Sequence, residues 1–140
     1  MAANTDPIFS RAPMIQWIGP IITPNTTPDL STGTSYLLFT ADAINGSFVT
    51  KLRLHATPAG STTAAVLRLF INNGATTATA TNNSLYDEIT LPATTASANA
   101  ATPNYEIPLN FALPAGYTLY ATIGANPTNG WYATVIGGRY

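Results

Sequence analysis

The sequence has little of the chemistry that reactive or metal-binding domains use. It contains no cysteine and one histidine in 140 residues. The absence of cysteine excludes a disulfide framework and a thiolate metal site. Charged residues make up 8% of the chain, against about a quarter in ordinary globular domains. The net charge is −1, so the basic stripe of a nucleic-acid-binding protein is missing and we expect no direct contact with nucleic acid.

Long apolar runs are missing as well. None is long enough to cross a bilayer, and the first twenty residues lack the basic start and apolar segment of a secretory signal. We therefore expect no membrane partner and synthesis in the cytoplasm. The low charge has two interpretations. The chain is either a neutral β-protein kept soluble by Thr and Asn, or a protein whose surface is covered in an assembly.

Catalytic groupings are equally scarce. His55 is the only histidine, and no Gly-x-Ser-x-Gly elbow accompanies it. It shares a strand face with Lys51 and Arg53, so we expect an exposed or hydrogen-bonded structural histidine. Asp87 and Glu88 are adjacent and point to opposite faces of a strand, and we expect Asp87 to be a partly buried acid paired with an arginine such as Arg68. No calcium loop, phosphate-binding loop or zinc spacing is present. The sequence predicts no enzyme and no cofactor or metal.

What the sequence does contain is a period of two. In residues 105–113, Tyr and apolar residues alternate with polar, small or proline residues, which is typical of a half-buried strand. Residues 65–72 are apolar on both faces, as a central strand is. In residues 47–56 we assign Phe48, Thr50, Leu52 and Leu54 to one face and the intervening residues to the other. Further strands are predicted at 35–41, 85–91, 117–124 and 131–136.

The connections then decide the architecture. Asn45-Gly46 is a hairpin turn, whereas residues 75–83 and 93–104 are Ala/Thr-rich stretches with no large anchoring side chain. Long connections of this kind fit Greek-key crossings between two sheets. The sequence predicts an all-β fold, an antiparallel β-sandwich of jelly-roll type, in residues 31–140.

Residues 1–30 are rich in proline and yet apolar, so we interpret them as an irregular N-terminal arm. Such an arm packs either on its own sandwich or on a neighbouring subunit. The interface candidates are the apolar residues of this arm together with one aromatic residue at the other end of the chain: Ile8, Phe9, Met14, Ile15, Trp17 and Tyr140. An alternative role for aromatic residues is sugar stacking, for which the candidates are Trp131 and Tyr132.

Several segments resemble one known family. They are residues 70–74 (Phe-Ile-Asn-Asn-Gly), 83–92 (Asn-Ser-Leu-Tyr-Asp-Glu-Ile-Thr-Leu-Pro), 112–117 (Ala-Leu-Pro-Ala-Gly-Tyr), and Gly130-Trp131 leading to Gly137-Gly138. The likeness also includes the first residues, 1–6 (Met-Ala-Ala-Asn-Thr-Asp), and runs over most of the chain. With these segments the sequence resembles the jelly-roll cement (decoration) proteins on the heads of tailed bacteriophages.

The resemblance implies a non-enzymatic virion protein, made in the host cytoplasm and bound to the outer surface of the head. There it would bridge subunits of the major capsid protein, itself a homodimer or, alternatively, a trimer. It identifies no individual binding residue. The alternative is a carbohydrate- or receptor-binding jelly-roll module on the virion surface.

Overall fold

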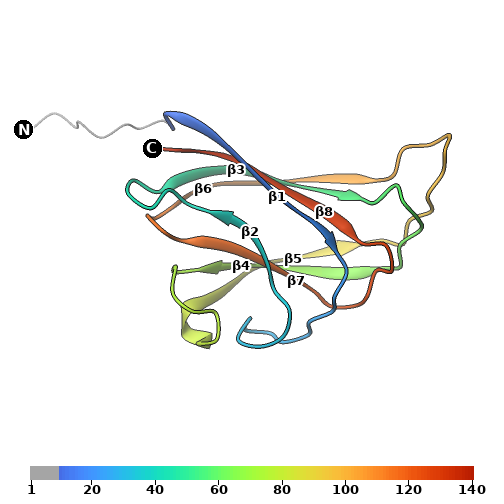
Figure 1. The fold of residues 1–140 in the computed structure, drawn as a ribbon, viewed down its shortest axis with the longest axis horizontal. Helices are drawn as coiled ribbons and strands as arrows, with labels where there is room; N and C mark the ends of the chain where they lie inside the picture. The colour runs from blue at the N-terminus through green and yellow to red at the C-terminus, as the bar shows by residue number, and fades with distance from the viewer. Residues whose placement is uncertain (1–9) are drawn as a thin grey trace, which may run out of the picture.

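The computed structural model describes residues 10–140 and contains two antiparallel sheets of four strands each. The eight strands, with one short 3-10 turn at Ala80–Asn82, are β1 (Ala12–Ile21), β2 (Tyr36–Thr40), β3 (Ser47–Ala56), β4 (Ala65–Asn72), β5 (Asn83–Leu91), β6 (Asn104–Leu113), β7 (Thr118–Ile123) and β8 (Trp131–Arg139). One sheet has the order β1-β8-β3-β6 and the other β2-β7-β4-β5. Figure 1 shows the first sheet above the second.

The strand pairing is nested. β4 pairs with β5, β3 with β6, β2 with β7 and β1 with β8, all antiparallel. The additional pairs β3·β8 and β4·β7 join these hairpins into the two sheets. Rolling one long nested hairpin into two sheets in this way produces the jelly roll. The predicted β-sandwich is confirmed, and its strand order is that of a jelly roll.

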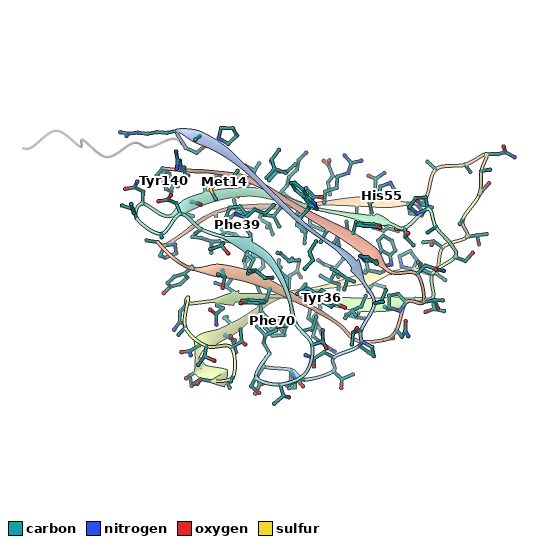
Figure 2. The ribbon with its side chains drawn as sticks, viewed as in Figure 1. Met14, Tyr36, Phe39, His55, Phe70 and Tyr140 are labelled. Carbon is teal, nitrogen blue, oxygen red and sulfur yellow. The ribbon has the colours of Figure 1, made fainter. Side chains whose placement is uncertain are left out.

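The core lies between the two sheets and is almost entirely aliphatic. Phe39, Leu52, Leu67, Leu119 and Trp131 are among its fully buried side chains. Figure 2 shows Phe39 in this interior layer. In β6 the inward positions alternate as predicted, since Leu109 and Leu113 are buried and Phe111 between them packs against the core, whereas Asn110 and Ala112 are exposed.

A bulge corrects the prediction for β3. The pairing of β3 with both neighbours shifts between Val49 and Lys51. An extra residue reverses the side-chain alternation, so Val49 is buried on one side of the shift and Leu52 and Leu54 are buried on the other. Our assignment of Phe48 and Thr50 to the same face as Leu52 was therefore wrong. Opposite the shift lies Gly137, whose added Cβ would collide with the Phe48 carbonyl oxygen.

The N-terminal segment also differs from the prediction. Residues 12–21 form β1, an edge strand paired with β8 from Ala12 to Ile18 and again, after a register shift, at Ile21. The expectation of an irregular arm is wrong for these residues, because prolines are tolerated at a sheet edge, where one side of the strand has no ladder to break. Pro13 and Pro20 both lie in β1, and Gly19-Pro20 is a cis peptide. The sandwich therefore begins well before residue 31.

The two outer faces are unlike. Beneath the second sheet, the loops after β1 and after β4 fold back across it (Figure 1). Asn83 Nδ2 ties them together by donating to the carbonyl oxygens of Asp29 at 2.9 Å and Thr77 at 2.8 Å. Leu30 from the first loop and Phe70 of β4 are buried here, outside the main core cluster. Among the residues that the structure describes, no loop of this kind crosses the outer face of the first sheet (Figure 1).

Candidate functional site

An amide side chain bridges the two sheets on one side of the sandwich. Gln16 of the edge strand β1 lies beside Thr40 of the edge strand β2. Its Nε2 donates to the Thr40 carbonyl oxygen at 3.0 Å, and the Thr40 N–H donates to its Oε1 at 2.9 Å. The side chain therefore pairs with the β2 main chain as a neighbouring strand would. We call these two bonds the Gln16 clamp.

Exposed apolar side chains surround this clamp. On β1, the residues on either side of Gln16 point outward, and Ile15 is 55% and Trp17 73% exposed. Leu37 on β2 is 42% exposed. Together with Gln16 and Leu38 they line a groove of about 360 Å³ between the two edge strands. We call Ile15, Trp17 and Leu37 the β1–β2 surface, and no charged residue lines its groove.

The register continues this surface onto the outer face of the first sheet. Ile15 is opposite Ile136 and Trp17 opposite Thr134 on β8. Beyond β8 the same rows reach Lys51 and Arg53 of β3. Lys51 Nζ lies 3.0 Å from Glu106 Oε2 on β6, in an exposed ion pair. The face is thus apolar along β1, mixed along β8, where Ile136 and Thr134 follow, and charged at Lys51, Arg53 and Glu106 on β3 and β6.

The interface candidates fall in different places. Ile15 and Trp17 are exposed together on the β1–β2 surface. Met14 points the other way, packs against the core and accepts a hydrogen bond at Sδ from Ser47 Oγ at 3.3 Å, so it offers little contact area. Tyr140 lines a different groove of about 410 Å³ with Arg11, Asp42 and Arg139 among its neighbours. Ile8 and Phe9 lie outside the described residues.

Tyr140 sits at the end of the molecule where β1 begins (Figure 2). At this end Asp42 organises the turn before β3. Its carboxylate accepts the N–H groups of Asn45 at 2.8 Å and Ile44 at 3.0 Å, and Arg139 Nη1 lies 3.9 Å away. These two backbone donors, with a smaller contribution from Arg139, hold the pKa of Asp42 below its usual value.

The sugar-stacking candidates are separated by the strand itself. Trp131 is fully buried in the core, 5.8 Å from the ring centroid of Tyr105. A ring in this position presents no face to a sugar, so Trp131 is wrong as a stacking residue. Tyr132, its neighbour on β8, is 41% exposed and lies against Gly19 of β1. The two rings therefore point to opposite faces of β8 and do not form one aromatic platform.

The predicted structural role of His55 is confirmed. Its ring Nδ1 lies 2.7 Å from the Ala56 carbonyl oxygen, and it is half-buried. The Asp87 prediction is wrong, because Arg68 Nε donates instead to Glu88 Oε1 at 2.7 Å and Asp87 is exposed. Within residues 10–140 no cluster of three His, Asp or Glu side chains is placed to hold a metal ion. No helix in this part of the chain is long and apolar enough to cross a membrane.

Sequence reasoning missed Gln16 and Leu37. Leu37 lies in the run Tyr-Leu-Leu-Phe-Thr, whose apolar residues are consecutive, so periodicity assigns no face to it. A register shift between Leu37 and Phe39 then turns Leu37 outward and leaves Leu38 and Phe39 buried. The role of Gln16 depends on its contact with β2, which is distant in sequence, so the residues around Gln16 do not predict it.

No protein-family model matches the chain, and no curated protein matches its sequence. Among solved structures it is similar to several of infectious bursal disease virus. Three of them are a Gx strain structure (14% identity, TM-score 0.36, covering 99% of this chain and 38% of the other), a Gt strain structure (13%, 0.31, 99% and 36%) and a VP2 subviral particle (16%, 0.30, 99% and 37%). The chain thus spans well under half the length of the structures it matches. Likenesses this distant carry no argument, and the fold assignment rests on the strand pairing.

Proposed function

We propose that this chain is a non-enzymatic structural protein of a phage virion. It decorates the outer surface of the head and stabilises the shell by bridging subunits of the major capsid protein. The observation that carries the proposal is the β1–β2 surface, where Trp17 is 73% exposed beside Ile15 and Leu37. Large exposed apolar side chains grouped in this way mark a surface that meets another protein, and tryptophan is the residue type most enriched among those that dominate binding energy.

The chemistry of this surface suits a permanent contact. Apolar contact does not weaken as salt rises, whereas contacts between exposed charges do. The groove between the two edge strands has no charged lining residue, and the whole chain is only 8% charged. The resemblance of the sequence segments to phage cement proteins supplies the identity of the partner. Self-association as a homodimer or trimer is part of the same proposal.

The test is the binding of the purified protein to heads from which it has been stripped. Trp17→Ala removes the largest exposed side chain of the β1–β2 surface and leaves the Gln16 clamp in place. We expect its binding to stripped heads to weaken by on the order of tenfold or more, the loss typical of a dominant interface residue. The control is Ile44→Ala, which truncates a side chain that is 84% exposed and lies in the turn before β3, away from the β1–β2 surface.

Equal binding of Trp17→Ala and the unsubstituted protein would remove the β1–β2 surface from the proposal. Binding measured at low and at high salt adds a second criterion, because a contact made by this surface is expected to persist in 1 M salt. Deleting residues 1–9 tests the contribution of Ile8 and Phe9 without touching β1. A larger deletion would remove an edge strand of the sandwich and confuse binding with folding.

The carbohydrate- or receptor-binding alternative loses one of its two stacking candidates, because the Trp131 ring is part of the core and only Tyr132 is exposed.

A further inference from the structure

The jelly roll has four edge strands, and three of them are closed to main-chain pairing. β1 contains Pro13 and Pro20, and β6 contains Pro108, each of which lacks the N–H that a ladder needs. β2 is only five residues long, and the Gln16 clamp already occupies the N–H and the carbonyl oxygen of Thr40. Proteins protect their sheet edges by such devices, because an open edge recruits another strand.

The fourth edge strand, β5, has neither a proline nor a clamp from another strand; its Glu88 N–H bonds only the neighbouring carboxylate, Asp87 Oδ1, at 2.8 Å. It runs for nine residues, Asn83–Leu91, without proline, lysine or arginine. All five residues from Ser84 to Glu88 are exposed, and Leu85 and Tyr86 are among the most exposed apolar side chains of the described chain. Within residues 10–140, β5 has β4 on one side and no strand on the other. Tyr86 and Phe111 of β6, with ring centroids 5.0 Å apart, mark this side of the sandwich.

The register limits where a strand can add. Pairing with β4 shifts at Tyr86, between Asp87 opposite Leu69 and Leu85 opposite Phe70. From Asp87 to Leu91 the pairing is regular. An incoming strand therefore finds a straight template over residues 87–91, and the bulge at Tyr86 bends the template away beyond it.

The side chains along this template specify what can add. Asp87 and Ile89 are two residues apart and lie on the same face of the strand. Asp87 is exposed, its Oδ1 accepts the Glu88 N–H at 2.8 Å, and no basic side chain of the described residues lies within ion-pair distance of it. An incoming carbonyl oxygen would take over the Glu88 N–H while a cation of the same segment pairs with the carboxylate. Glu88 differs, because its carboxylate is paired with Arg68. A cross-strand cation opposite Asp87 and an apolar residue opposite Ile89 are the favourable neighbours.

We infer that the β5 edge is a strand-addition site. It takes an extended segment of a partner protein that presents a lysine or arginine and an apolar side chain at alternate positions. The identity of the partner as a capsid protein rests on the proposed function, whereas the site itself rests on the sheet geometry. β5 and β6 lie on the opposite side of the sandwich from β1 and β2. A molecule that bridges two subunits needs two contacts, and this edge is the second.

The first experiment is a titration followed by NMR with a capped peptide, acetyl-Thr-Val-Thr-Lys-Thr-Val-amide, which offers a cation flanked by apolar residues in either strand direction. We expect saturable shifts confined to the amides of residues 84–91, with new protection from hydrogen exchange at alternate positions. N-methylation of one alternate set of peptide amides should abolish binding, and methylation of the other set should leave it intact. No saturable shift, or indifference to both methylations, overturns strand addition.

Charge reversal provides the second criterion. Asp87→Lys should weaken binding of the lysine peptide by on the order of tenfold, because an attraction becomes a repulsion. It should strengthen binding of the same peptide with glutamate in place of lysine. The control is Glu106→Lys, which makes the same charge change on the neighbouring edge strand β6 and should leave the affinity unchanged. Equal effects of the two variants would show a diffuse electrostatic attraction and overturn the site.

Stripped heads separate this inference from the proposed function. If heads release Trp17→Ala but retain Asp87→Lys as firmly as the parent, the cement function stands and β5 is not the second contact. If the peptide binds at β5 but heads bind no form of the protein, the strand-addition site stands and the proposed function fails.

Discussion

Substitutions of Gln16 can test the two hydrogen bonds of the Gln16 clamp together and one at a time. Replacing Gln16 with Met keeps the length of the side chain but removes both bonds to Thr40. Each such bond contributes about 0.5–1.5 kcal/mol net, so the loss is about 1–3 kcal/mol. At about 2.1 cal/mol/K of unfolding entropy per residue, 140 residues convert this into a fall in Tm of about 3–10 °C.

Gln16→Glu sharpens the test, because its effect depends on pH. Above its pKa the glutamate still accepts the Thr40 N–H but sets a carboxylate oxygen against the Thr40 carbonyl oxygen. The protonated acid donates to that carbonyl oxygen and restores both bonds. The clamp therefore raises the folded-state pKa of this glutamate above the unfolded value of about 4.3. The restored stability is fully present below pH ~4 and is lost as the pH rises through the folded pKa.

The assay is urea unfolding of the parent, Gln16→Met and Gln16→Glu at pH 3.5 and pH 7, with hydrogen exchange of the Thr40 amide. Gln16→Glu should approach the parent at the lower pH and resemble Gln16→Met at the higher one. Gln16→Met should also speed exchange at Thr40 more than at the core of β4, because the two sheet edges open locally. A pH-independent gap between Gln16→Glu and the parent, or unchanged exchange at Thr40, would refute the clamp.

Two further predictions concern the turn and the bulge at the same end of the fold. Asp42→Asn removes a carboxylate whose pKa is held below its usual 3.8 by backbone donors. The parent should therefore be more stable than the variant at pH 7, and this advantage should be lost as the pH falls through the folded-state pKa of Asp42. Equal urea midpoints of the two proteins at pH 7 would contradict the prediction. Gly137→Ala should destabilise by about 1–3 kcal/mol through its collision with the Phe48 carbonyl oxygen, whereas Gly124→Ala, whose Cβ has no contact closer than 3.6 Å, should change the unfolding midpoint little.

The strands were largely predictable because most are runs of alternating or continuous apolar residues bounded by turn residues. The predicted range 65–72 for β4 and the range 47–56 for β3 coincide with the strands observed. Alternation fails where the backbone inserts a residue, as at Thr50 in β3, since a bulge is set by the facing strands and by Gly137 rather than by local sequence.

Proline content misled the prediction for β1. Its prolines exclude a central strand, but an edge strand tolerates them, and sequence alone does not tell which strand will be at an edge. For the candidate site, Ile15 and Trp17 were predictable as apolar residues with no place in a regular core pattern. Leu37 and Gln16 were not, because both act through a neighbour brought close only by the fold.

The nested pairing has a consequence for biosynthesis. β1 pairs with β8, the strand that the ribosome makes last among those described, while β4 and β5 are close in sequence and can pair first. At about 5–20 residues per second, several seconds pass between the appearance of β1 and that of its partner. During that interval Ile15, Trp17 and Ile18 have no sheet to join. The strand that we propose to bind the capsid is thus the one that stays unpaired longest during synthesis. Its two prolines lack the N–H groups that pairing with another nascent chain would need, and so they disfavour premature association.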